Sequence, residues 1–173
     1  MLANQEENRP VDIAAMRAVG LTVWVTYPRT VPQAIASLGS MLAILGVDKP
    51  EWLAAAEGLW AQAWTGERVR AVVPIWRRPW MVVGSDTFAG DVLNRLGVDN
   101  MFARSPERYP RIDLDDLPEH DVVVLPDEPY SFSASDGPES FDAPVRLVSG
   151  RHLTWYGPSL VDARQVLRRE LWP

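Results

Sequence analysis

Hydrophobic positions change period along the first third of the chain. Residues 8–19 open with a proline in the first turn and precede a glycine, which is the punctuation of a helix. The run Leu21–Thr26 is rich in β-branched and aromatic residues and predicts a strand. Thr30 and Gln33 then have the spacing of a capping box. Apolar residues recur behind them on one helical face, which predicts a helix over 31–45.

A stripe of large apolar residues marks the next helix, over 51–64. Trp52, Ala56, Trp60 and Trp64 recur every four residues and therefore share one face. We interpret this face as core packing, because tryptophan buries a large apolar area. The helix stands between two segments of mixed strand and helix, so we predict three regions: the remnant of a first α/β lobe (1–46), a connecting helix (47–66) and a second α/β lobe (67–173).

From residue 69 onward, predicted strands alternate with predicted helices. Strands are expected at Val69–Ile75, Asp121–Leu125 and Val145–Val148. The second of these is almost wholly apolar, which is typical of a parallel strand covered on both faces. Ser85 is expected to cap one helix, and another begins near Ser159. The alternation predicts an α/β fold with a mainly parallel sheet.

Two connections in this region have distinctive composition. The segment 126–144 is long, acidic and rich in proline, and a short helix is expected within it at Pro138–Phe141. Ser149 and Gly150 are expected to form a turn after the last strand.

Charge and composition exclude several classes of protein. The net charge of -6 argues against binding to nucleic acid or to an anionic membrane, because both need a basic surface. The absence of cysteine excludes disulfides, thiolate metal sites and cysteine nucleophiles. No run reaches the roughly 20 apolar residues of a membrane helix, and residues 1–8 lack the basic and apolar regions of a signal peptide.

No constellation typical of an enzyme is visible. His120 and His152 lack metal-ligand spacing, and we interpret both as ordinary surface or hydrogen-bonded histidines. Nucleophile elbows, phosphate loops and dinucleotide fingerprints are missing from the sequence. The pairs Asp115–Asp116 and Asp127–Glu128 could bind a hard cation or act as acid and base. Adjacent carboxylates point to different sides, so we interpret them as helix caps and solvated loops. The chain is therefore predicted not to be an enzyme and to carry no cofactor.

Aromatic residues gather where ligands bind in open α/β sheets. Trp76 and Trp80 follow the strand predicted at 69–75, and Trp155 and Tyr156 follow the strand at 145–148. Tyr109 lies in a loop that can reach the same edge. The ligand crevice of an open α/β sheet lies outside the carboxyl ends of its strands. We predict a flat-walled, largely apolar pocket there, with lid packing as the alternative for each aromatic residue.

Six strings together resemble the C-terminal lobe of the helical-backbone metal receptors, the class III substrate-binding proteins of cobalamin and ferric-siderophore ABC importers. Their order and spacing carry the resemblance, which covers nearly the whole chain: Trp76–Met81, Gly84–Phe88, Leu96–Phe102, Arg108–Ile112, Val124–Tyr130 and Thr154–Pro158.

The resemblance implies a fold and a function. Two Rossmann-like lobes would be joined by one long helix, and a metal chelate (cobalamin, heme or a ferric siderophore) would bind in the cleft between them without catalysis. The protein would be periplasmic or on the cell surface, and would deliver its ligand to an ABC transporter permease. The ligand-binding residues implied by the matching strings are Trp76, Trp80, Tyr109, Trp155 and Tyr156, with Asn4 and Gln5 from the other lobe.

Asp115 aligns with the carboxylate through which the C-terminal lobe of such proteins docks on the permease. No residue is implied as a direct ligand of the metal.

The sequence departs from the resemblance at its start. The first lobe of these receptors begins with further strand–helix units, so we expect a complete C-terminal lobe and an incomplete N-terminal lobe, from a truncated or misassigned start. Two alternatives stay open. One is a fragment that binds nothing, and the other is a cytosolic flavodoxin-like sensor or enzyme domain.

Overall fold

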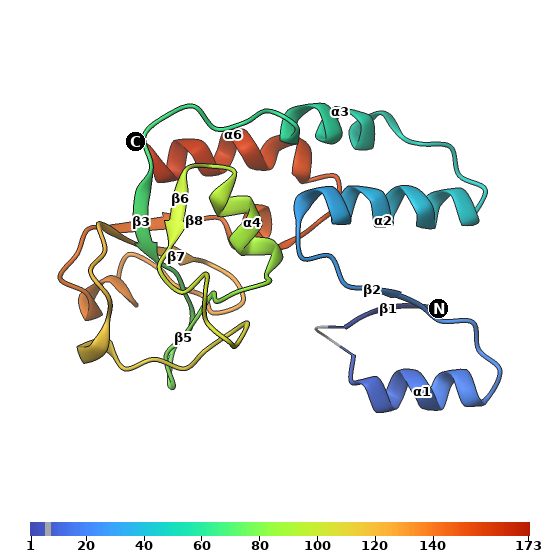
Figure 1. Cartoon of the computed structure of the whole chain (residues 1–173), viewed down its shortest axis with the longest axis horizontal. Coiled ribbons are helices and arrows are strands. Elements are labelled where there is room, and N and C mark those ends of the chain that lie inside the picture. Colours follow the sequence, from blue (N-terminus) through green and yellow to red (C-terminus); the bar gives the residue numbers. More distant parts are fainter. Residues whose placement is uncertain (6–7) are drawn as a thin grey trace.

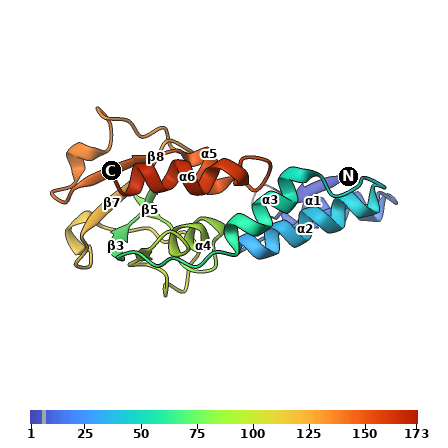
Figure 2. The ribbon, with the colours of Figure 1, turned by 90° about the horizontal axis from the view of Figure 1, so that it is seen from above.

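The fold is seen in a computed structural model that describes residues 1–5 and 8–173 (Figure 1). A small N-terminal part holds two strands and a helix, at the lower right of Figure 1. A larger C-terminal part surrounds a four-stranded sheet. Two helices, α2 and α3, run along the molecule beside the junction, and Figure 2 shows that the whole is elongated. No helix in the described ranges is long and apolar enough to cross a membrane.

The N-terminal part is built from β1 (Leu2–Asn4), α1 (Pro10–Ala18) and β2 (Trp24–Thr26). The strands are parallel, with Asn4 opposite Thr26, and a small core forms between them and α1. The helix is confirmed. The strand is shorter than predicted, because Leu21 donates its N–H to the Met16 carbonyl at 3.2 Å and so closes the helix instead of pairing.

The two following helices are α2 (Val31–Ile44) and α3 (Glu51–Trp60). The cap of α2 is confirmed: the Thr30 hydroxyl accepts the Gln33 N–H at 3.3 Å, and the Gln33 side chain accepts the Arg29 N–H at 2.9 Å. The predicted end of α3 at Trp64 is wrong. The buried Trp60 indole donates to the Leu160 carbonyl at 2.8 Å, and Trp64 lies beyond the helix.

The C-terminal sheet contains β3 (Val69–Val72), β6 (Val98–Asn100), β7 (Val122–Pro126) and β8 (Val145–Val148). All its pairings are parallel, in the order β6-β3-β7-β8, so the predicted parallel sheet is confirmed. The helices of this part are α4 (Phe88–Asn94), α5 (Gly150–Thr154) and α6 (Leu160–Leu171).

All five residues of β7 are buried, and alternate side chains enter two different cores. Val122 and Val124 belong to the large core that is shared with α2, α3, α4 and α6. Val123 and Leu125 belong to a second cluster, in which residues of the 126–144 connection cover the sheet. A long loop therefore takes the place of a helical layer on this face.

An ion pair between Asp121 and Arg70, which we call the charged clamp, lies at the start of β7. Asp121 accepts the backbone N–H of Arg70 at 2.9 Å and the guanidinium of the same residue at 2.7 Å. These hydrogen bonds from Arg70 lower the pKa of the Asp121 carboxyl to about 2. The charged clamp joins the start of β7 to β3.

Several local predictions need correction. The strand expected over 69–75 is interrupted at Val73, and β4 (Pro74–Trp76) pairs antiparallel with β5 (Met81–Val82). The cap of α4 is Thr87, whose hydroxyl accepts the Gly90 N–H at 3.1 Å; Ser85 precedes it by two residues. The turn expected at Ser149–Gly150 instead begins α5.

Other expectations hold. The short helix in the long loop is confirmed as η2 (Pro138–Ser140), a 3-10 turn. A second such turn, η1 (Leu114–Asp116), lies before β7. The division at residues 46 and 66 stays a prediction. The side chains of Val31, Ala34 and Ile35 from α2 share the large core with the C-terminal helices.

A substitution at Gly97 tests the packing of Trp64, which lies beyond the end of α3. Gly97 has a φ of +82°, and a methyl group at this position would overlap the indole of Trp64, whose ring stacks on Trp172 at 5.4 Å. We expect Gly97→Ala to lower the free energy of unfolding by about 1–3 kcal/mol, measured by urea denaturation.

Gly46→Ala is the matched control. Gly46 also has a positive φ, of +70°, but open space surrounds it, so the substitution adds backbone strain without overlap and is expected to lower the free energy of unfolding by only about 1 kcal/mol. Equal effects of the two substitutions would contradict the packing of Trp64 on Gly97.

Candidate ligand-binding cleft

A cleft of about 580 Å³ lies where the N-terminal and C-terminal parts meet. Its walls combine aromatic, aliphatic and polar side chains from seven places in the chain: Tyr109, Trp155 and Tyr156; Ile75, Val83, Ala89 and Pro129; Asn4, Glu128 and Thr154. Two other hollows, of about 510 Å³ and 630 Å³, lie along α2–α3 and beside α4. Their walls contain none of the aromatic residues that the sequence predicts to bind a ligand.

Strand ends bring these residues together. Asn4 ends β1, Ile75 lies in β4 just after β3, Glu128 follows β7, and Trp155 follows β8 through α5. The carboxyl ends of parallel strands meet at one edge of a sheet, which is where open α/β folds bind ligands. The predicted position of the pocket agrees with the position of this cleft.

Tyr156 joins the two parts at the cleft. Its hydroxyl accepts a hydrogen bond from the Asn4 side chain at 2.6 Å and lies 3.2 Å from the Thr26 hydroxyl. Its ring packs edge-on against Phe88, with centroids 5.6 Å apart. The carboxyl ends of β1 and β2 are thereby held against the C-terminal part by one side chain.

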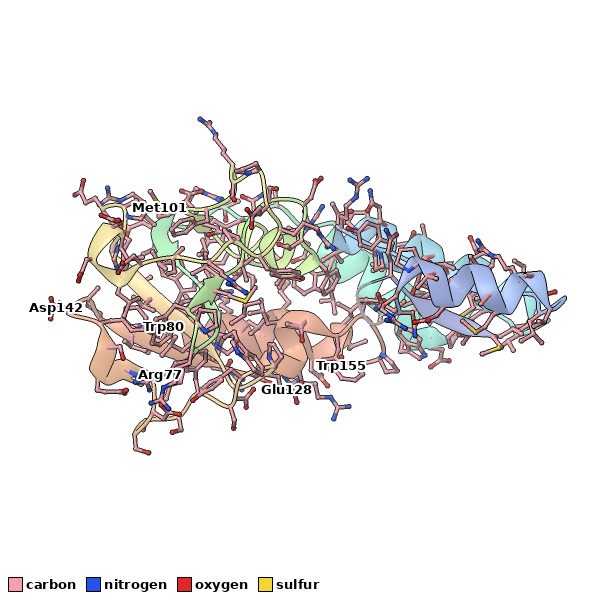
Figure 3. The ribbon with its side chains drawn as sticks, turned by 90° about the horizontal axis from the view of Figure 1, so that it is seen from below. Arg77, Trp80, Met101, Glu128, Asp142 and Trp155 are labelled. Carbon is pink, nitrogen blue, oxygen red and sulfur yellow. The ribbon has the colours of Figure 1, made fainter. Side chains whose placement is uncertain are left out.

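Trp155 is 63% exposed, yet its ring is tethered. The indole N–H donates to the Glu128 carboxylate at 2.9 Å (Figure 3). The backbone of Glu128 is in turn pressed against Gly150, where a methyl group would overlap it. The Gly150 N–H also donates to Asp127 at 2.6 Å, so Asp127 acts as a helix cap, as predicted for this pair.

Tyr109 reaches the cleft from a segment that runs beside β5. The Gly84 N–H donates to the Arg108 carbonyl at 2.7 Å, and a methyl group on Gly84 would overlap the backbone of this segment. The Arg108 guanidinium stacks over the rings of Tyr27 (4.5 Å) and Tyr109 (5.5 Å). Glycine at position 84 therefore sets how closely Tyr109 approaches the sheet.

Three of the predicted ligand-binding residues lie outside the walls of this cleft. Trp80 stacks on Phe132 at 5.9 Å within the loop-covered core, and Trp76 packs edge-on against Tyr130 at 5.7 Å. Gln5 is exposed and donates its backbone N–H to Thr26 at 3.1 Å. Their roles in ligand binding stay predictions, as does that of the four residues in the walls.

Sequence reasoning did not single out several residues of the walls. As part of an acidic loop, Glu128 is predicted to be solvated, and the sequence predicts no ligand contact for Thr154. Their place after β7 and within α5 was the available signal, because strand ends line such clefts. Ile75 and Pro129 also lie at strand ends, so the same signal applies to them, whereas Val83 and Ala89 carry no sequence pattern that distinguishes them from core residues.

Asp115 and the two histidines are not among the residues that form the walls of the cleft. Asp115 is exposed in η1, and its N–H is capped by Asp113 at 3.2 Å. His120 lies 2.7 Å from the Pro118 carbonyl, and His152 lies 2.8 Å from the Ser149 hydroxyl, so each ring has a local partner. Within the described ranges, no group of three or more His, Cys, Asp or Glu side chains could hold a metal ion.

Comparison with known proteins identifies the fold. No protein-family model and no curated protein matches the sequence. Among solved structures, the periplasmic vitamin B12 binding protein BtuF of Vibrio cholerae superposes with a TM-score of 0.74 at 17% identity, over 98% of this chain and 72% of its own. Helicobacter pylori CeuE with Ni(II) bound gives a TM-score of 0.79 at 14% identity, over 99% and 61%.

The periplasmic heme-binding protein BhuT, in complex with two hemes, gives a TM-score of 0.69 at 21% identity, over 98% of this chain and 73% of its own. The chain has the class III periplasmic binding protein fold. The two-lobed α/β architecture expected from the sequence is thereby confirmed, and the chain spans 61–73% of the length of these three structures. Two of these three neighbours, BtuF and BhuT, are binding proteins by name.

The bond between Tyr156 and Asn4 can be tested by a double-mutant cycle. Tyr156→Phe removes the hydroxyl and keeps the ring, while Asn4→Ala removes the donor. Each substitution is expected to lower the free energy of unfolding by about 1 kcal/mol, measured by urea denaturation. The double mutant should lose at least about 0.5 kcal/mol less than the sum, whereas additive losses would show that the two groups do not interact.

Proposed function

We propose that this chain is the substrate-binding component of an ABC importer and holds a metal chelate in the cleft. One observation carries the proposal. Side chains from both parts of a class III binding-protein fold, Asn4 on one side and Tyr109, Trp155 and Tyr156 on the other, surround a single cleft at the strand ends. Solved proteins with this fold include ones named for vitamin B12 binding and for heme binding, and one whose structure holds Ni(II).

The chemistry of the walls supports an organic ligand with a large flat face. Aromatic rings bind such faces by stacking, each contributing on the order of 1 kcal/mol beyond burial. Aliphatic residues Ile75, Val83 and Ala89 add apolar surface beside these rings. We therefore propose a chelated metal, such as a corrinoid, a heme or a ferric siderophore, with cobalamin as the leading candidate. The protein itself is proposed to need no resident cofactor.

Delivery to a membrane permease is the second half of the proposal. The fold is shared with periplasmic proteins, which supports a periplasmic or cell-surface location. Asp115 lies exposed in η1, is not among the wall residues of the cleft, and is proposed as the carboxylate that docks on the permease. Separation of the two surfaces would allow docking while the ligand is bound.

Ligand binding can be followed by tryptophan fluorescence. Cyanocobalamin, hemin and a ferric siderophore are titrated separately into the protein, and at least one is expected to quench emission at micromolar concentration, because Trp155 lines the cleft. Tyr109→Ala should then raise the Kd about five-fold, which corresponds to the loss of roughly 1 kcal/mol.

Trp76→Phe is the comparison variant and also tests the role predicted for Trp76 from the sequence: this residue lies outside the walls, so binding in the cleft would leave the Kd unchanged and remove Trp76 from the predicted ligand contacts. The proposal of a chelate-binding protein fails if none of the three compounds quenches. A larger loss from Trp76→Phe than from Tyr109→Ala would move the binding surface away from this cleft.

The docking role of Asp115 is tested by reversing its charge. Asp115→Lys is expected to leave the Kd for the chelate unchanged and to weaken co-purification with the permease about ten-fold or more, because like charges then face each other. Asp142→Lys, at another exposed aspartate, is the control. Unchanged co-purification of the Asp115 variant would remove this residue from the docking surface.

A further inference from the structure

The described walls of the cleft carry very little formal charge. Among the described residues that form its walls, Glu128 is the only one with a formal charge, and neither lysine nor arginine is present there. The carboxylate lies among aromatic and aliphatic side chains, including Pro129 and Trp155. A bound ligand would therefore meet one fixed negative charge and no compensating cation on the wall.

The position of this carboxylate is fixed from two sides. The Trp155 indole donates to it at 2.9 Å, and the Glu128 backbone is wedged against Gly150 at the start of α5. An indole donor is neutral, so the bond orients the carboxylate without cancelling its charge. Glu128 cannot turn away from the cleft without losing this hydrogen bond.

Arg108, which precedes Tyr109 in the chain, and Arg29 both have partners outside the cleft walls. Arg108 stacks over Tyr27 and Tyr109 and donates its Nε–H to the Asp86 carbonyl at 2.9 Å. Arg29 forms an ion pair with the Asp86 carboxylate at 3.1 Å. Neither guanidinium is part of the cleft wall. The chain as a whole carries a net charge of -6, which adds to the negative potential around the cleft.

We propose that Glu128 determines which chelates the cleft accepts, favouring those with zero or positive net charge over anionic ones. The inference rests on the proposed function and narrows its ligand class. Glu128 is exposed, so water screens its charge. An effect of roughly three-fold in Kd per unit of ligand charge is the expected scale for two charges several ångströms apart in partly aqueous surroundings.

Two probes with the same macrocycle separate the effect of ligand charge from that of ligand shape. Hemin carries two propionates, and hemin dimethyl ester carries none. In the unsubstituted protein, Kd is measured for both, with cyanocobalamin as an uncharged corrinoid. Glu128→Gln keeps an oxygen that can accept the Trp155 indole N–H and removes the charge. This variant is expected to tighten hemin binding about ten-fold and to leave the ester within about two-fold, because only hemin is repelled.

Two further variants separate charge from position. Asp142→Asn changes the net charge by the same amount at the opposite end of the C-terminal part, as Figure 3 shows, and should leave the ratio of the two Kd values unchanged. Trp155→Phe keeps an aromatic ring and removes the hydrogen bond that holds Glu128 toward the cleft, so the carboxylate can turn away and the Kd for hemin should fall relative to that for the ester. Raising the salt concentration should reduce the ratio of the Kd for hemin to the Kd for the ester in the unsubstituted protein. The same ratio should not change with salt in the Glu128→Gln variant.

The outcomes distinguish this inference from the proposed function. If none of the three compounds binds the unsubstituted protein, both fail together. If they bind, and Glu128→Gln shifts hemin and its ester equally, the charge selection is overturned while chelate binding stands. A shift confined to hemin, absent from Asp142→Asn, supports Glu128 as the residue that selects ligand charge.

Discussion

The fold depends on covering both faces of β7. This strand is buried along its whole length, and a parallel strand in such a position needs an apolar layer on each side. Helices α4 and α6, with α2 and α3, supply one layer, and the 126–144 loop supplies the other through Phe132 and its neighbours. Since β3, β7 and β8 are parallel, the connections that leave them all start at the same edge of the sheet.

The cleft is a consequence of that arrangement. Each connection that leaves the sheet edge contributes a wall residue: Ile75 after β3, Glu128 after β7 and Trp155 after β8. The N-terminal part closes the remaining side through β1, with Asn4 bonded to Tyr156. Recognition by this cleft would depend on stacking and on one carboxylate, a combination that distinguishes ligands by shape and charge more than by numerous hydrogen bonds.

Local patterns in the sequence predicted the elements whose cause is local. The helices α1 and α6, the cap formed by Thr30 and Gln33, and the buried strand β7 all follow from periodicity or capping within a few residues. The end of α3 could not be found in this way, because Trp64 is placed by Trp172 and Gly97, which are distant in sequence.

Part of the candidate cleft could be predicted because its residues follow the ends of parallel strands. Strand ends located Tyr109, Trp155 and Tyr156 at one cleft, since topology alone brings them there. Trp76 and Trp80 satisfy the same rule, but the loop that covers β7 offers their rings aromatic partners. No sequence pattern shows which strand-end aromatic residue will pack under a loop. The Glu128 side chain is oriented by Trp155, which is 27 residues away in the sequence, and neither composition nor spacing predicts such a pairing.

The loop over β7 has a consequence for the protection of the sheet from solvent. A helical layer is held by its own backbone hydrogen bonds, whereas this loop is held largely by side chains. Arg77 pairs with Asp136 and, at 2.6 Å, with Glu139, and its guanidinium lies over Trp80. Local opening of a protein begins where few such attachments must break. Opening of this loop would therefore expose the side chains of Val123 and Leu125 to water while the hydrogen bonds between β7 and its two neighbouring strands stay in place.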